Sequence, residues 1–412
     1  MRIALISDIH YGELATCSEF ALKGQDIKTG NVDSTNSLLR GVTEILKEEG
    51  PEYLLIAGDL TSGGRPVEFK YCYQTIEKLG EDIGVDPSKI LFCIGNHDVD
   101  WGITSIADKF VTDDKDDRNY MRNFYQYLAS SVSVRVLKNQ ASQKLCPNYK
   151  DAWGTPFAGV VEYENCVMFV LNSGHLSAHN QEYKHGVLTT DQMHWFTKMA
   201  KEYQKCEKIK LVLLHHHPFN YPNYFPGLDI STLEEGANLS DICGKNGISL
   251  VLHGHKHQPA AKTRMESDWK NTVTFICAGS LSVDASERAK GEIPNTFHLI
   301  DYNSPNEIIL KNYSYSMADG WSLATYSKAT PVDGIMKLGR VVNPELVNKF
   351  IQELPPNQWI PLENLDYELQ SLTKNELKNY IEARYGVDTV HFDSQRVPTS
   401  IYIFSLSKSE VK

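Results

Sequence analysis

The chain opens with a series of short apolar runs, each followed directly by polar residues. The runs 3–7, 53–57 and 90–94 have the length and apolar content of strands that are buried on both faces. The segments between them carry apolar residues at helical spacing, and Gly50 with Pro51 ends the first of these helices. The sequence therefore predicts a β-α-β-α-β unit, which restricts the chain to folds built on a sheet covered by helices.

The same rhythm returns after an irregular stretch and then changes. Strands are predicted at 167–171, 209–214 and 248–252, with helices at 190–203 and 239–244 between them. Later strands follow one another without a helix, at 272–277, 296–301 and 307–315. A shift from alternating to strand-rich sequence is typical of two sheets packed together with helices outside. The predicted fold class is thus α/β, in its α+β form.

The length of the chain predicts more than one structural unit, because 412 residues exceed what one hydrophobic core usually supports. We expect a main domain over 1–328, with an insertion at about 99–150 where the pattern becomes irregular. A small α+β extension is expected over 329–412. Within it, residues 373–376 have the spacing of a capping box, and a β-rich run covers 400–406.

Net charge, the length of apolar runs and the spacing of cysteines disfavour several classes of function. The net charge of −11 has the wrong sign for gripping the backbone of a nucleic acid. No apolar run approaches the roughly 18 residues of a transmembrane helix, and the N-terminal apolar stretch is too short for a signal peptide. We therefore expect a cytoplasmic protein without membrane insertion. The eight cysteines stand singly, without a CxxC pair, which favours reduced thiols over a zinc ribbon or a disulfide scaffold.

Five polar groups come directly after predicted strands, and each offers side chains that can bind a metal. They are Asp8-Ile9-His10, Gly58-Asp59, Gly95-Asn96-His97-Asp98, His215-His216-His217-Pro218 and Gly254-His255-Lys256-His257. Taken singly, each is better explained by a helix cap, a turn or chance than by a functional role. Because loops at the carboxyl ends of strands converge on one side of a sheet, all five can meet at one point. Mixed oxygen and nitrogen donors without cysteine favour manganese, iron or zinc.

The order of these groups resembles the calcineurin-like metallophosphoesterase family, whose blocks are DxH, GD, GNH[DE], a histidine at a strand end and GHxH. The resemblance covers about residues 1–315 and implies a four-layer αββα sandwich of two mixed sheets flanked by helices. It also implies two divalent metal ions bridged by one aspartate, with the ligand sets Asp8, His10, Asp59 and His257, and Asp59, Asn96, His216 and His255. His216 is chosen because the family's ligand lies two residues before a proline, here Pro218, and His215 and His217 are the alternatives.

These residue types suit the hydrolysis of a phosphate ester. Two ions can lower the pKa of a shared water, giving hydroxide for the attack, and hold the phosphoryl oxygens. His97 is placed to stabilise the developing charge and to donate a proton to the departing alkoxide, as the resemblance also implies. Asp98 could orient His97 through the other ring nitrogen. The alternative is that His97 is a turn residue without a chemical role.

The prediction of which ester is hydrolysed rests on a resemblance that is less specific than the metal-binding motif. Residues 186–192, 215–218 and 250–255 resemble the branch of cyclic-nucleotide and glycerophosphodiester phosphodiesterases. We therefore expect a small phosphate-ester substrate, a diester with cyclic nucleotides first. A nuclease related to repair exonuclease subunits is the alternative, because GHKHQP at 254–259 also resembles their final block. A phosphomonoesterase is a further alternative, and a binding module with a dead site is disfavoured because every implied ligand is intact. The sequence makes no prediction of oligomeric state.

Overall fold

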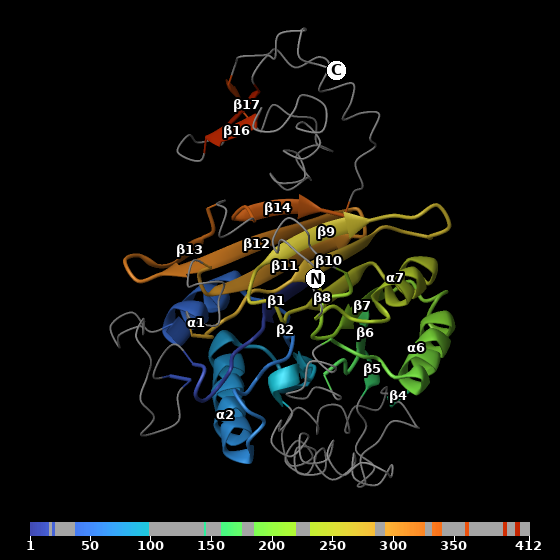
Figure 1. Ribbon diagram of the computed structural model, residues 1–412, viewed down its shortest axis with the longest axis horizontal. Coiled ribbons are helices and arrows are strands. Elements are labelled where there is room, and N and C mark those ends of the chain that lie inside the picture. The colour runs from blue at the N-terminus through green and yellow to red at the C-terminus, as the bar shows by residue number, and fades with distance from the viewer. Residues whose placement is uncertain are drawn as a thin grey trace.

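Two seven-stranded sheets form the centre of the molecule in this computed structural model (Figure 1). The structure describes residues 1–15, 19–20, 38–98, 144–145, 158–174, 185–219, 231–284, 293–325, 332–339, 359–361, 390–393 and 400–403.

The first sheet combines the N-terminal strands with strands from the second half of the chain. The N-terminal strands run parallel to one another, whereas all other pairs in this sheet are antiparallel. Its order is β13 (Gly320–Leu323), β12 (Glu307–Ser316), β11 (Thr296–Ser304), β1 (Arg2–Ile6), β2 (Tyr53–Ile56) and β3 (Ile90–Phe92), with β14 (Ile335–Leu338) paired to β12.

The second sheet is built from the middle of the chain and is also mixed. Its order is β4 (Lys144–Leu145), β5 (Gly159–Glu162), β6 (Cys166–Val170), β7 (Ile209–Leu213), β8 (Leu250–His253), β10 (Val273–Cys277) and β9 (Ala260–Arg264). The four strands from β6 to β10 in this order are parallel. A separate small sheet contains β15 (Trp359–Pro361), β17 (Ser400–Ile403) and β16 (Val390–Asp393).

Helices cover the outer faces of both large sheets, and the apolar residues separate into three layers of core. One cluster lies between the sheets and joins residues such as Leu5 and Leu55 to Met168 and Leu213. The outer clusters pack α1 (Leu38–Glu49) and α2 (Pro66–Ile83) on the first sheet, and α6 (Thr190–Glu202) and α7 (Gly236–Lys245) on the second (Figure 1). This arrangement confirms the predicted four-layer sandwich.

The helices begin and end where local chemistry dictates. In α1 the buried residues Leu38, Val42 and Leu46 recur every fourth position, so one stripe faces the sheet. Helix α2 has proline in its first turn and ends at Gly84, whose φ of 76° is a left-handed cap. In α6 the Thr189 side chain accepts a hydrogen bond from the Gln192 amide.

Within the described residues, the predicted strands and helices of the main domain are present. The strands that were not predicted are β4, β5, β9 and β13, and, beyond residue 328, β14, β15 and β16. The domain boundary at residue 328 stays a prediction, although β14 pairs with β12, so the chain adds a strand to the first sheet beyond that residue. Of the predicted extension, the run at 400–406 contains β17, whereas the capping box at 373–376 lies outside the described residues, as does most of the 99–150 insertion.

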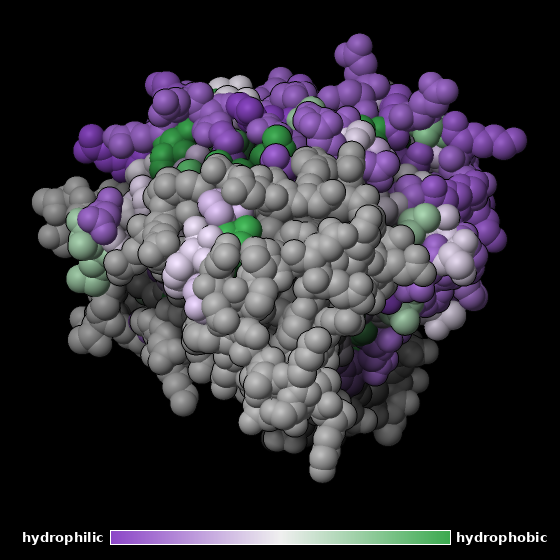
Figure 2. All heavy atoms as spheres, turned by 90° about the horizontal axis from the view of Figure 1, so that it is seen from above, coloured by the Kyte–Doolittle hydropathy of each residue, from purple (hydrophilic) through white to green (hydrophobic). Residues whose placement is uncertain are grey.

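Hydrophilic side chains predominate among the described residues on the face shown in Figure 2. Within the described part of the chain, no helix has the length and apolar character needed to span a bilayer.

Candidate metal centre

The polar groups predicted from the sequence meet at the carboxyl ends of strands in both sheets. Two sets of side chains have potential ligand atoms within 4.8 Å of one another. The first contains Asp8, His10, Asp59 and His257, and the second contains Asp59, His215 and His255. Because Asp59 belongs to both, the two sets form one continuous site.

In the first set, nitrogen and oxygen atoms face each other at short distances. His10 Nε2 lies 3.2 Å from His257 Nε2 and 3.5 Å from Asp59 Oδ2. His257 Nε2 lies 3.3 Å from Asp8 Oδ1. Asp8 and His10 are fully buried. Buried ionisable groups that converge in this way are normally paired or bind a metal, so the donor set fits a divalent cation.

Asn96 adds an amide oxygen beside the imidazoles of the second set. His215 Nε2 lies 3.2 Å from Asp59 Oδ2 and 3.0 Å from Asn96 Oδ1. His255 Nδ1 lies 2.8 Å from the same Asn96 oxygen. On its other side, His215 Nδ1 donates to the Ala57 carbonyl at 2.7 Å. This hydrogen bond fixes the tautomer of the ring and leaves Nε2 as the atom facing the cluster.

The structure places His215 in this cluster, and the predicted His216 lies next to it, with ring centroids 5.1 Å apart. His216 Nδ1 lies 2.9 Å from Ser173 Oγ, and its ring belongs to neither ligand set. The buried Nε2 of His216 has no hydrogen-bond partner among the described residues, and the ring centroids of His216 and His255 are 4.3 Å apart, so the choice of His216 as a ligand stays a prediction. The candidate set that the geometry supports therefore contains His215, which was one of the two alternatives.

The backbone of the candidate ligands is strained. Among the described residues, every non-glycine residue with positive φ belongs to the candidate set, namely Asp8 (51°), His10 (49°), Asp59 (50°), His255 (83°) and His257 (54°). A left-handed conformation of this kind costs on the order of 1–3 kcal/mol at each residue. The surrounding fold therefore holds these loops in conformations that turn the side chains toward one point.

Two glycines permit the close packing of the ligand loops. A Cβ atom on Gly95 would overlap Oδ1 of Asp59, and one on Gly254 would come within 2.7 Å of Oδ2 of Asp8. Glycine is thus required in front of Asn96 and His255 because any side chain would displace a carboxylate.

The charges of the site suit a cation. Burial opposes ionisation of Asp8 and Asp59, but the adjacent imidazoles outweigh it and lower the pKa of both carboxyls. Burial lowers the pKa of His10 to about 4. For His215, burial acts in the same direction, but the Asp59 carboxylate outweighs it and raises the pKa to about 9. Ionised carboxylates and a neutral His10 are ready to bind a metal, and His215 carries the proton that a cation would displace.

His97 lies beside the cluster and is anchored by a group that the sequence did not indicate. Its backbone amide donates to Asp59 Oδ1 at 2.8 Å, and its ring packs edge-on against His10 with centroids 4.6 Å apart. Its Nδ1 lies 3.1 Å from the Ser62 carbonyl. The Ser62 carbonyl thus accepts a hydrogen bond from the His97 ring and orients it.

Asp98 was predicted to orient His97, and its carboxylate makes hydrogen bonds to backbone and hydroxyl groups. It accepts hydrogen bonds from the Gly95 amide at 2.9 Å and from the Thr61 amide and hydroxyl at 3.0 and 3.1 Å. Burial, with the nearby Asp59, raises the pKa of Asp98 to about 7. Asp98 therefore joins the loop after β3 to the loop after β2. The sequence signal for Thr61 and Ser62 was their position directly after the Gly58-Asp59 group.

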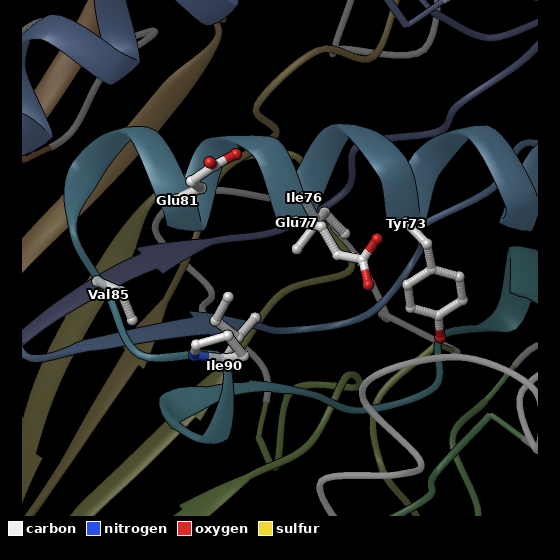
Figure 3. Close-up of a pocket in the computed structure, with 7 residues that line it drawn as sticks. Tyr73, Ile76, Glu77, Glu81, Val85 and Ile90 are labelled. Atoms are coloured by element: carbon white, nitrogen blue, oxygen red, sulfur yellow. The ribbon is translucent and has the colours of Figure 1, made fainter.

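An apolar pocket of about 370 Å³ lies against α2 and is separate from this site (Figure 3). Its walls include Tyr73, Ile76, Val85 and Ile90, and none of the candidate ligands lines it.

Two packed sheets with paired ligand sets at the ends of their strands suit metal-dependent hydrolysis. The sequence profile of the calcineurin-like phosphoesterase family matches residues 1–259, and the chain belongs to this family. Its members use two divalent metal ions, in agreement with the two ligand sets that share Asp59.

The solved structures that the chain matches include two phosphatases. A dimetal phosphatase from Danio rerio is 11% identical, with a TM-score of 0.46, and the alignment covers 76% of this chain and 95% of that one. A purple acid phosphatase from yellow lupin (Lupinus luteus) seeds is 13% identical, with a TM-score of 0.46 and coverage of 78% and 52%. A Zn²⁺ complex of Vps29 from Entamoeba histolytica is 12% identical, with a TM-score of 0.31 and coverage of 78% and 96%. A search of curated proteins found no match.

Proposed function

We propose that this chain is a phosphodiesterase that hydrolyses a small phosphodiester, with cyclic nucleotides as the first candidates. The observation that carries the proposal is the pair of ligand sets joined by Asp59, because a carboxylate shared between two cation sites is the arrangement that two-metal phosphoester hydrolysis needs. The choice of a diester is supported by the likeness of residues 186–192 and 250–255 to the cyclic-nucleotide and glycerophosphodiester branch. The net charge of −11 disfavours the alternative of a nuclease.

The proposed ligands follow from the distances in the cluster. One ion would be held by Asp8, His10, Asp59 and His257, and the other by Asp59, Asn96, His215 and His255. Oxygen and imidazole donors in equal measure, without a thiolate, fit manganese, iron or zinc. When bound, the two cations supply an activated water and neutralise the charge of the phosphoryl oxygens.

His97 is the proposed general acid. Its Nδ1 donates to the Ser62 carbonyl, so the imidazolium holds its second proton on Nε2. That proton would pass to the leaving oxygen as the phosphorus–oxygen bond breaks, so that an alcohol departs rather than an alkoxide. The contact of the His97 amide with Asp59 fixes the distance between the acid and the bridging carboxylate.

The substrate class is tested by comparing bis-p-nitrophenyl phosphate with p-nitrophenyl phosphate in the presence of Mn²⁺. We expect faster hydrolysis of the diester, measured as kcat/KM, and no hydrolysis after chelation of the metal. A panel of cyclic nucleotides, glycerophosphodiesters and single-stranded DNA then identifies the natural class. Faster hydrolysis of the monoester would overturn the proposed diester specificity, and degradation of DNA in preference to the small diesters would favour the nuclease.

Two adjacent histidines provide a matched pair for the ligand assignment. We expect His215→Ala to lose at least one of the two metal equivalents and to lower kcat/KM by about a hundredfold or more, because its Nε2 faces Asp59 and Asn96. His216→Ala should retain both equivalents, since His216 belongs to neither ligand set. Elemental analysis of the bound metal and steady-state kinetics show which of the two variants loses a metal ligand. The reverse pattern would restore His216 as the ligand.

A further inference from the structure

Three serine hydroxyls bind three consecutive carbonyls of the loop that carries the first metal-binding group, residues 8–10. The Oγ atoms of Ser280, Ser282 and Ser62 donate, in that order, to the carbonyls of residues 8, 9 and 10. The first of these hydrogen bonds is 2.7 Å long and the third is 2.6 Å. Ser62 lies in the loop after β2, whereas Ser280 and Ser282 lie in the loop after β10, so the loop 8–10 is held from two sides.

The two serines after β10 are fixed by their own surroundings. Ser280 and Ser282 are fully buried. Ser280 Oγ also accepts from the Val283 amide at 2.8 Å, and the Leu281 amide between the serines donates to the carbonyl of Ser7 at 2.9 Å. The Ser280 hydroxyl is therefore oriented toward the loop 8–10, and burial restricts the hydroxyl of Ser282.

The loop needs such donors because its backbone is strained. Asp8 and His10 have φ values of 51° and 49°, which turn their peptide groups out of line with β1. The amides of these two residues donate to Gly58 and Asp59 carbonyls at 3.0 Å, but no described backbone amide donates to the carbonyls of residues 8–10. Buried carbonyls require partners, and the serine hydroxyls supply them.

We propose that Ser280 and Ser282, together with Ser62, are positioning residues that hold the loop 8–10 in its metal-binding conformation and thereby set the affinity of the first metal site. This inference rests on the proposed ligand role of Asp8 and His10. Ser280 and Ser282 lie outside residues 1–259, the part of the chain that matches the family. Ser62 is not substituted in the test, because its carbonyl also accepts a hydrogen bond from His97.

The test uses the full-length variants Ser280→Ala and Ser282→Ala and measures Mn²⁺ binding by competition with a fluorescent chelator. We expect the first metal site to bind about ten- to a hundredfold more weakly in each variant, as is typical when a group that orients a metal ligand is lost. Ser282→Thr, which keeps the hydroxyl, should retain more of the affinity than Ser282→Ala. Cysteine variants, nearly equal in volume but poor donors, replace the alanine variants if these do not fold, with the same expected loss.

Ser249→Ala is the matched control. Ser249 is a buried serine whose Oγ lies 2.5 Å from the Tyr302 hydroxyl, and it contacts no candidate ligand among the described residues. Its variant should lose stability, measured by thermal unfolding, without a change in Mn²⁺ affinity. Wild-type affinity in both Ser280→Ala and Ser282→Ala, or an equal loss in Ser249→Ala, would overturn the role of the serines. A wild-type protein that binds no Mn²⁺ would instead remove the metal centre itself, and the serine role with it.

Discussion

Replacement of Asp59 by asparagine is expected to abolish metal binding and hydrolysis together. Asp59 is the one residue common to both ligand sets, and its Oδ2 lies 3.5 Å from His10 Nε2 and 3.2 Å from His215 Nε2. Asparagine has nearly the same shape but carries no charge, so it cannot balance two cations. A metal centre lowers the activation barrier by several kcal/mol, so its loss should reduce kcat/KM by about a thousandfold or more.

Three measurements separate loss of the centre from loss of the fold. Elemental analysis should give less than one metal equivalent in Asp59→Asn, and circular dichroism should show a folded chain. Added Mn²⁺ should raise the melting temperature of the wild-type protein, because a ligand that binds only the native state stabilises it, but not that of the variant. Asp241→Asn makes the same chemical change on α7, at a residue paired with Lys245, and should leave metal content and activity unchanged. Two retained equivalents in Asp59→Asn would contradict the bridging role.

The strands that the sequence predicted most directly are those whose own residues form a continuous apolar run. Strands such as β2 and β6 are continuous apolar runs with every residue buried, so their pattern alone indicates a central strand. Strand β9 contains Lys262, Thr263 and Arg264, and β13 buries none of its four residues fully. These edge strands exist because a neighbouring strand offers hydrogen bonds, which a single-sequence pattern does not contain.

The site was predicted to the level of loops, and in part to the level of atoms. Strand-end positions correctly brought Asp8, Asp59 and His255 together, because parallel strands direct their following loops to one edge. The choice of His216 over His215 stays a prediction, because adjacent residues point in different directions and the sequence does not show that His215 Nε2 faces Asp59 and Asn96. Backbone acceptors such as the Ser62 carbonyl were missed because every residue type has them.

His97→Ala is expected to retain both metal ions and to lose turnover in proportion to the difficulty of the leaving group. General acid catalysis contributes roughly a hundred- to ten-thousandfold, but only where the departing oxygen needs a proton. The p-nitrophenolate ion is a stable anion, so hydrolysis of p-nitrophenyl esters should fall little. An alkyl diester or a cyclic nucleotide, which releases a basic alkoxide, should show the full loss. The slope of log kcat against leaving-group pKa should therefore become steeper in the variant.

The dependence on leaving group is what distinguishes an acid from a residue that only shapes the loop. A turn residue without a chemical role would lower the rate for all esters by the same factor, because the damage would lie in the position of Asp59, to which the His97 amide donates. His194→Ala, at an exposed position of α6, is the matched control and should change neither slope nor metal content. Equal losses for good and poor leaving groups would assign His97 to the support of the loop, and near wild-type turnover on the alkyl diester would exclude it as the acid. Since the amide contact persists in alanine while the ring does not, only the acid role predicts a steeper slope with an intact metal centre.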